Sequence, residues 1–144
     1  GDLPWFSDYG FELSRGFRAL RAWMSIKEHG AKKHTRLIAQ NLAQARYLAG
    51  LVEAAPELEL SAPVVLNVVC FRFVRPGLGE PALDRINKAI EVELQERGLA
   101  VVSTATVRGR LCLHAAICNH RSRREDFDFL AREVIRLGGE LCAD

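Results

Sequence analysis

The sequence predicts an α/β domain in which helices pack on a small, mainly antiparallel sheet. Three observations predict this class. Apolar residues recur every three or four positions in three segments, and an earlier segment is apolar around most of a helix. Four shorter segments have the composition of strands, and a tight turn joins the last two. The resulting order, α-α-β-β-α-β-β-α, is that of an α/β sandwich.

The first predicted helix, about Ser14–His29, has almost no polar surface. Its polar side chains fall on one narrow stripe, and apolar residues from Phe17 to Ile26 cover most of the remaining circumference. Gly30 provides the C-terminal stop. A helix this apolar must be enclosed, so we expect another polypeptide surface to pack on it. Residues 1–13 are rich in aromatic side chains and are expected to form an arm or linker before a domain over residues 14–144.

The three later helices are amphipathic, and each has recognisable end signals. They are expected over about Lys32–Ala54, from Pro81 to a stop at Gly98, and from a capping box of Ser122 and Glu125 to a stop at Gly138-Gly139.

The strands are predicted from short apolar runs. Leu58–Leu60 reads as an edge strand, and Val64–Val74 is apolar on both alternating faces, which is typical of a strand in the middle of a layered sheet. Leu99–Val107 and Arg110–Cys118 form a predicted hairpin that turns at Arg108-Gly109.

Composition is that of an ordinary globular protein, with 49% hydrophobic and 26% charged residues among 144. The net charge of +2 gives no basic excess for nucleic acid. No apolar run approaches the roughly 20 residues that span a bilayer. The start lacks a signal peptide and a methionine, so we expect a chain cut from a longer cytoplasmic protein.

Motifs for self-contained catalysis are absent from the sequence. There is no GxSxG, P-loop, GxGxxG or HExxH pattern. The four cysteines have no CxxC spacing and are expected to be free thiols, not metal ligands. The four lysines lie among polar neighbours, where desolvation cannot activate an amine. We therefore assign no catalytic residue and no metal ligand to this chain.

Three features are candidates for binding. His114 lies at the centre of the last predicted strand, on a face with Cys112, Ala116 and Cys118, and is either a cleft wall or a buried histidine with a hydrogen-bond partner. Arginines on the apolar first helix either form ion pairs across an interface or bind an anion. A basic cluster before the last helix is expected to be solvated. The residues are Arg15 and Arg18 on the first helix, and His120, Arg121, Arg123 and Arg124 in the cluster.

Several segments resemble one known family. The run LSRGFRALRAW, Leu13–Trp23, resembles the arginine-rich helix of the pyridoxal-phosphate-dependent amino-acid decarboxylases, the group that includes the aromatic-L-amino-acid, glutamate and diaminobutyrate enzymes. Val65–Val74, Leu113–Asp128 and the terminal Leu137-Gly138-Gly139 are similar to the same family in the same order.

This resemblance implies the C-terminal small domain of a fold-type-I, homodimeric lyase of amino-acid and other carboxylic-acid metabolism. In that family pyridoxal 5'-phosphate is bound through a lysine of the large domain, which has no counterpart here, so the chain is expected to be inactive alone. The complete enzyme would release CO2 from an amino acid, with an aromatic one favoured. The rival interpretations are a freestanding ferredoxin-like ligand-binding or dimerisation module, and an aminotransferase-type small domain of the same fold.

The resemblance also assigns roles to residues. His114 stands where the family usually carries an arginine that contacts the substrate carboxylate, and histidine could do this only when protonated. Arg110, on the same strand face about 13 Å away, is not expected to replace it. We therefore expect His114 to bind substrate, and Arg15 and Arg18 to lie at the junction with the large domain.

Overall fold

The computed structural model describes residues 16–143, which fall into two compact units that divide between Arg36 and Leu37. The predicted arm and Arg15 lie outside the described residues. In the first unit, α1 (Arg18–His29) has no buried residue and ends at Gly30, whose positive φ of 74° is one that residues with a side chain rarely adopt. The helix α2 (Ala31–Ala54) begins in the first unit and ends in the second.

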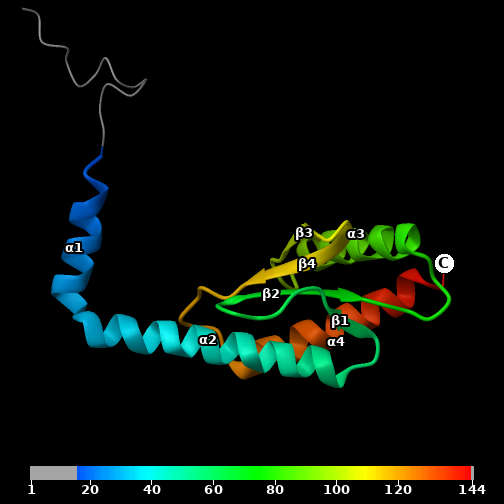
Figure 1. Ribbon diagram of the computed structural model, residues 1–144, viewed down its shortest axis with the longest axis horizontal. Helices are drawn as coiled ribbons and strands as arrows, with labels where there is room; N and C mark the ends of the chain where they lie inside the picture. Colours follow the sequence, from blue (N-terminus) through cyan, green and yellow to red (C-terminus); the bar gives the residue numbers. More distant parts are fainter. Residues whose placement is uncertain (1–15, 144) are drawn as a thin grey trace, which may run out of the picture. The chain divides into compact units, whose positions relative to one another are not determined.

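The second unit is built around a four-stranded antiparallel sheet of order β1-β2-β4-β3 (Figure 1). The predicted α/β class and element order are confirmed. The β3–β4 hairpin turns at Arg108 and Gly109, both with positive φ, as a two-residue hairpin requires. The remaining elements are β1 (Leu58–Leu60), β2 (Val68–Phe73), α3 (Glu80–Glu96), β3 (Ser103–Val107), β4 (Arg110–Ala116) and α4 (Arg124–Leu141). No helix of the described residues is both long and apolar enough to cross a membrane.

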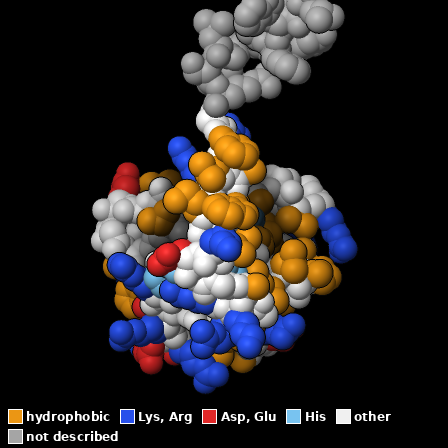
Figure 2. Space-filling view, turned by 90° about the vertical axis from the view of Figure 1, so that its left-hand side faces the viewer, with side chains coloured by type: hydrophobic (Ala, Val, Ile, Leu, Met, Phe, Trp, Pro, Cys, Tyr) orange, Lys and Arg blue, Asp and Glu red, His pale blue; other side chains and the backbone are white. Residues whose placement is uncertain are grey.

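Three strands are shorter than predicted, because strand pairing sets their ends, and one of them, β4, ends at Ala116 instead of Cys118. β2 begins at Val68, which pairs with the last residue of β4, so Val65 and Leu66 lie in a loop and are 79% and 64% exposed. Figure 2, which views the molecule from this end of the sheet, shows hydrophobic side chains at the surface. β3 begins only at Ser103 because the backbone N–H of Leu99 closes the end of α3 by donating to Leu94.

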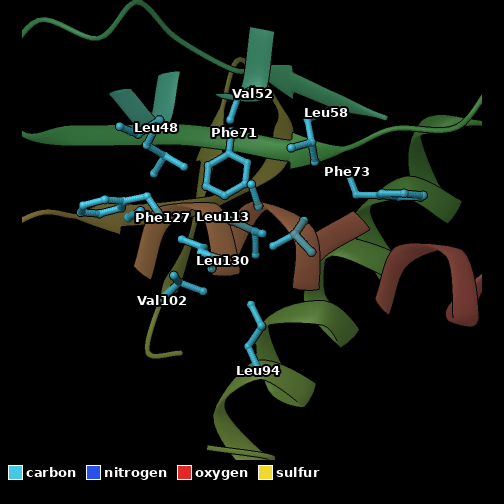
Figure 3. Close-up of a cluster of buried hydrophobic side chains, with 14 of the residues drawn as sticks. Leu48, Val52, Leu58, Phe71, Phe73, Leu94, Val102, Leu113, Phe127 and Leu130 are labelled. Carbon is cyan, nitrogen blue, oxygen red and sulfur yellow. The ribbon is translucent and has the colours of Figure 1, made fainter. Parts of the chain in front are cut away.

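The core lies between the sheet and the helices (Figure 3). On β2 and β4 alternate residues face the helices, and the cross-strand pair Phe71 and Leu113 is fully buried. Helices α2, α3 and α4 all contribute to this cluster, with Leu48, Ile90 and Val134 each fully buried. Burial of this face is the main source of stability for the second unit.

Two polar side chains of α3 attach that helix to the sheet where β2 and β4 no longer pair. Asn87 is fully buried, accepts from the backbone N–H of Phe73 at 2.8 Å and donates to the Phe73 carbonyl at 2.9 Å. Asp84 accepts from the backbone N–H of Leu111 at 2.9 Å. These side chains take the place of strand partners, since buried backbone groups must be paired.

The ends of α4 differ from the prediction. The Ser122–Glu125 capping box is wrong: the helix begins one residue later, and the backbone N–H of Arg123 donates to Asp126 at 2.8 Å. Gly138-Gly139 does not stop the helix, which continues to Leu141. Gly138 is buried against Phe73, and a Cβ at this position would overlap the ring. The glycine is therefore required by close packing and not by helix termination.

The two glycines make a matched pair for a stability test. Gly138→Ala should lower the free energy of unfolding by about 1–2 kcal/mol, because overpacking against Phe73 outweighs the gain in helix propensity. Gly139→Ala should raise it by up to about 1 kcal/mol, because that position is exposed and open. Urea denaturation of both variants checks this expectation. Equal effects of the two substitutions would contradict the packing explanation.

Candidate functional site

The sheet has an outer face, whose side chains alternate with those that enter the core. Charged side chains gather at one end of this face, and small or apolar side chains surround His114 and Ser103 over the rest of it. Ser103 and Ala116 are exposed. His114 pairs with Ser103 on the neighbouring strand and is half-buried. The outer face consists of Glu59 of β1; Val68, Cys70 and Arg72 of β2; Arg110, Cys112, His114 and Ala116 of β4; and Ser103, Ala105 and Val107 of β3.

His114 lies near the centre of this face, as its place in the strand predicted. It is opposite Cys70 on β2 and opposite Ser103 on β3. Its ring Nδ1 is 3.1 Å from the Ser103 Oγ. The histidine is half-buried and has a hydrogen-bond partner, as the second of the two alternatives left open by the sequence requires, and it does not line the pocket described below.

An ionic cluster fills one end of the outer face. Arg72 has a side chain only 1% exposed, and its Nη2 is 2.8 Å from Glu80 Oε2. Arg110 reaches the other oxygen of Glu80 at 2.7 Å and Glu59 at 3.0 Å. Asp84 lies 3.8 Å from Arg72. The cluster joins β1, β2, β4 and the start of α3.

The ion pairs of the cluster shift the pKa of its members away from their ordinary values. Hydrogen bonds from Arg110 and then Arg72 lower the pKa of Glu80 to about 2. The same bond raises the pKa of Arg110. Arg110 is engaged by two carboxylates, Glu59 and Glu80, and is therefore not a free cation on this face. Arg72 was not among the residues predicted for a site, and its one signal in the sequence is that it is a lone arginine in an apolar strand.

The cysteines are free, in agreement with the sequence prediction. Cys112 is buried and Cys70 is half-buried. Burial is the main cause that raises the pKa of the Cys70 thiol, and the nearby Cys112 raises it further. Cys118 lies beyond the end of β4 and is exposed. Among residues 16–143 no group of three or more histidine, cysteine, aspartate or glutamate side chains is placed to hold a metal ion.

A pocket of about 400 Å³ lies beside the sheet, between the loop before β3, the end of β4 and the start of α4. Its lining is largely aliphatic and aromatic, with Ile117, Phe127 and Leu130 among the members, and Val101 at its edge is 92% exposed. His114 is not part of this lining. Polar side chains, among them Ser122 and Asp126, complete the lining, and the pocket does not join His114 to other titratable groups.

The remaining candidates belong to other elements than His114. Arg18 is exposed on α1 in the first unit, and no ion pair of Arg18 occurs within the described part of the chain. The basic cluster His120–Arg124 is mostly exposed in the loop that leads into α4. In that cluster Arg124 stacks over the ring of Tyr47 at 5.0 Å.

The chain does not provide a lysine suited to pyridoxal phosphate. A lysine that forms an imine needs a desolvated amine with a lowered pKa. All four lysines of the sequence are exposed, and the Nζ of Lys88 pairs with Glu91 at 2.6 Å. We assign no residue of this chain to that cofactor.

The ionic cluster predicts how stability changes in acid. Because the pKa of Glu80 is about 2 in the folded chain and 4.5 ordinarily, its contribution is present above pH 4.5 and is lost as the pH falls toward 2. Glu80→Gln should therefore flatten the fall in the free energy of unfolding across this window, measured by urea denaturation. Glu57→Gln, in the exposed turn before β1, is the control and should keep the original slope. An unchanged slope in Glu80→Gln would show that the cluster does not hold this carboxyl.

Comparison with known proteins identifies the family. Residues 4–74 match the pyridoxal-dependent decarboxylase conserved domain. The chain is 28% identical over 137 residues to an aromatic-L-amino-acid decarboxylase of Bacillus atrophaeus, covering 94% of this chain and 28% of that protein. It is 30% identical over 122 residues to tryptophan decarboxylase 1 of Oryza sativa subsp. japonica, covering 81% of this chain and 24% of that protein. The chain thus spans less than a third of the length of these relatives.

Solved structures agree. The glutamate decarboxylase domain of the diaminobutyrate-pyruvate transaminase and L-2,4-diaminobutyrate decarboxylase from Vibrio parahaemolyticus superposes with a TM-score of 0.75 at 30% identity, covering 85% of this chain and 26% of that one. Oryza sativa TDC with PLP and tryptamine shares the fold, with a TM-score of 0.81 at 24% identity over 94% of this chain and 29% of that one. The chain therefore belongs to the pyridoxal-dependent decarboxylase family and corresponds to the C-terminal portion of these proteins.

Proposed function

We propose that residues 14–144 are the small domain of an amino-acid decarboxylase and that its outer face docks on a large domain outside this chain. Residues 1–13 are the linker in this proposal. The large domain carries the pyridoxal phosphate, whose ring supplies the electron sink for loss of a carboxylate. The small domain closes over the substrate and is inactive alone.

This proposal is carried by one observation: the second unit leaves apolar side chains uncovered on and beside the outer face of its sheet. An antiparallel sheet whose second face meets water normally carries polar side chains there. Away from the ionic cluster, the outer face instead carries Val68, Cys70 and Ala116, with Val65 and Leu66 exposed in the loop before it. An apolar surface of this kind marks a site of protein contact.

The first unit supports the same conclusion independently. Five large apolar side chains near or on α1 are 42–71% exposed, although a soluble helix normally buries such a stripe. A large domain packed on α1 would bury them, and Arg15 and Arg18 would then lie at the junction. The exposed apolar residues are Phe17, Leu20, Trp23, Met24 and Ile26.

We assign His114 to the carboxylate end of the substrate. It is the polar side chain at the centre of the outer face, and an imidazolium donates charge-assisted hydrogen bonds to a carboxylate. An aromatic amino acid is the favoured substrate, since the relatives include aromatic-L-amino-acid, tyrosine and tryptophan decarboxylases. A cytoplasmic homodimer is the expected form of the complete enzyme.

The experiment is to express the complete reading frame that encodes this chain beside the 144-residue chain itself. Release of labelled CO2 is measured from carboxyl-labelled tryptophan, tyrosine and glutamate, with and without added pyridoxal phosphate. We expect release only from the complete product, only with the cofactor, and faster from the aromatic substrates. The chain alone should release none.

Two further results decide the role of His114. His114→Arg should lower KM for the amino acid about tenfold and flatten its pH dependence, since one added charge-assisted hydrogen bond is worth about 1.4 kcal/mol or more. His120→Arg, in the exposed loop, is the matched control and should change neither. A reading frame limited to these residues, or a complete product without CO2 release, would favour a freestanding ferredoxin-like module instead.

A further inference from the structure

Ser103 and His114 form a cross-strand pair on the outer face. The Ser103 Oγ lies 3.1 Å from the ring Nδ1 of His114 and 3.5 Å from the backbone carbonyl oxygen of the same residue, to which it donates. Ser103 is on the edge strand and is itself exposed. The Ser103 side chain therefore does not pack in the hydrophobic core, and its hydrogen-bond contacts are with His114.

The hydroxyl has one hydrogen and two lone pairs, so it donates either to Nδ1 or to the His114 carbonyl, and in the second case it accepts from Nδ1. If the hydrogen is donated to the His114 carbonyl, the Oγ can only accept from the ring, and Nδ1 must carry the proton. The neutral ring is then protonated at Nδ1, and Nε2 is an unprotonated acceptor. Which nitrogen carries the proton is set in this way by the partner of the other nitrogen.

No other group on the neighbouring strands competes for this ring. On β2 the facing residues are Cys70, directly opposite, and Arg72; on β4 they are Cys112 and Arg110. β3 itself, Ser103–Val107, carries no titratable side chain. Both arginines are engaged by the ionic cluster, and the raised pKa of Cys70 keeps that thiol neutral at pH 7. The serine is thus the polar partner that orients the histidine.

We propose that Ser103 is a positioning residue that holds neutral His114 in the Nδ1–H tautomer and reserves Nε2 for a carboxylate ligand. The neutral ring then presents a lone pair, which repels a carboxylate. Uptake of one proton from solvent converts Nε2 into a donor while Nδ1 stays bonded to Ser103. Carboxylate capture is therefore conditional on ring protonation. The identity of the ligand as a carboxylate rests on the proposed function, whereas the tautomer of His114 does not.

The tautomer is tested on the 144-residue chain by NMR of the ring nitrogens after ¹⁵N-histidine labelling, with His114→Gln to assign the signals. When the ring is neutral, the unmodified chain and Ser103→Thr, which keeps the hydroxyl, should both show Nδ1–H. Ser103→Ala should shift the proton toward Nε2. Thr104→Ala, one residue along β3 and on the opposite face, is the control and should leave the tautomer unchanged.

Two results would overturn the inference: a neutral ring protonated at Nε2 in the unmodified chain, or an Nδ1–H ring that persists in Ser103→Ala. In the complete product the pH profile of kcat/KM should change in Ser103→Ala and be restored in Ser103→Thr. The NMR result needs no activity, so it can fail while CO2 release is still observed. The reverse outcome, a confirmed tautomer without CO2 release, would reject the proposed function and keep the serine–histidine pair.

Discussion

Packing of the helices on only one face of the sheet is the constraint from which the other features follow. Phe71 and Leu113 pair across β2 and β4 and are fully buried against that layer. The closeness of the packing requires a glycine at position 138, against Phe73, and a buried amide at Asn87 to satisfy the Phe73 backbone. Because side chains alternate along a strand, the same arrangement leaves a second face to be covered by something else.

Local signals predicted those features that depend on neighbouring residues alone. Gly30 ends α1, and Arg108-Gly109 makes the hairpin turn, because both need backbone conformations that short segments specify. The ends of β2 and β3 could not be predicted this way, since partner strands determine them. Gly138 was misjudged for a similar reason: a buried contact with Phe73, distant in sequence, is indistinguishable from a stop signal in one sequence.

The candidate site shows the same division. The position of His114 at mid-strand could be predicted, and the resemblance to the decarboxylases supplied its expected role. Its partner Ser103 could not, because the register of β3 against β4 is a property of the folded sheet. Arg72 was equally hidden, since its burial is tolerated only when carboxylates from other elements reach it, above all Glu80. The sequence therefore indicated the type of site but not the hydrogen bonds that define it.

The central claim is that the apolar surface around the outer face is covered in the complete protein. Hydroxyl-radical footprinting compares side-chain oxidation in the 144-residue chain and in the product of the complete reading frame. We predict that Val65, Leu66 and Val101 are strongly oxidised in the chain and protected in the complete product, while Val92, exposed on α3, reacts equally in both. Equal oxidation of all four residues in the two proteins would contradict the claim that another part of the protein docks there.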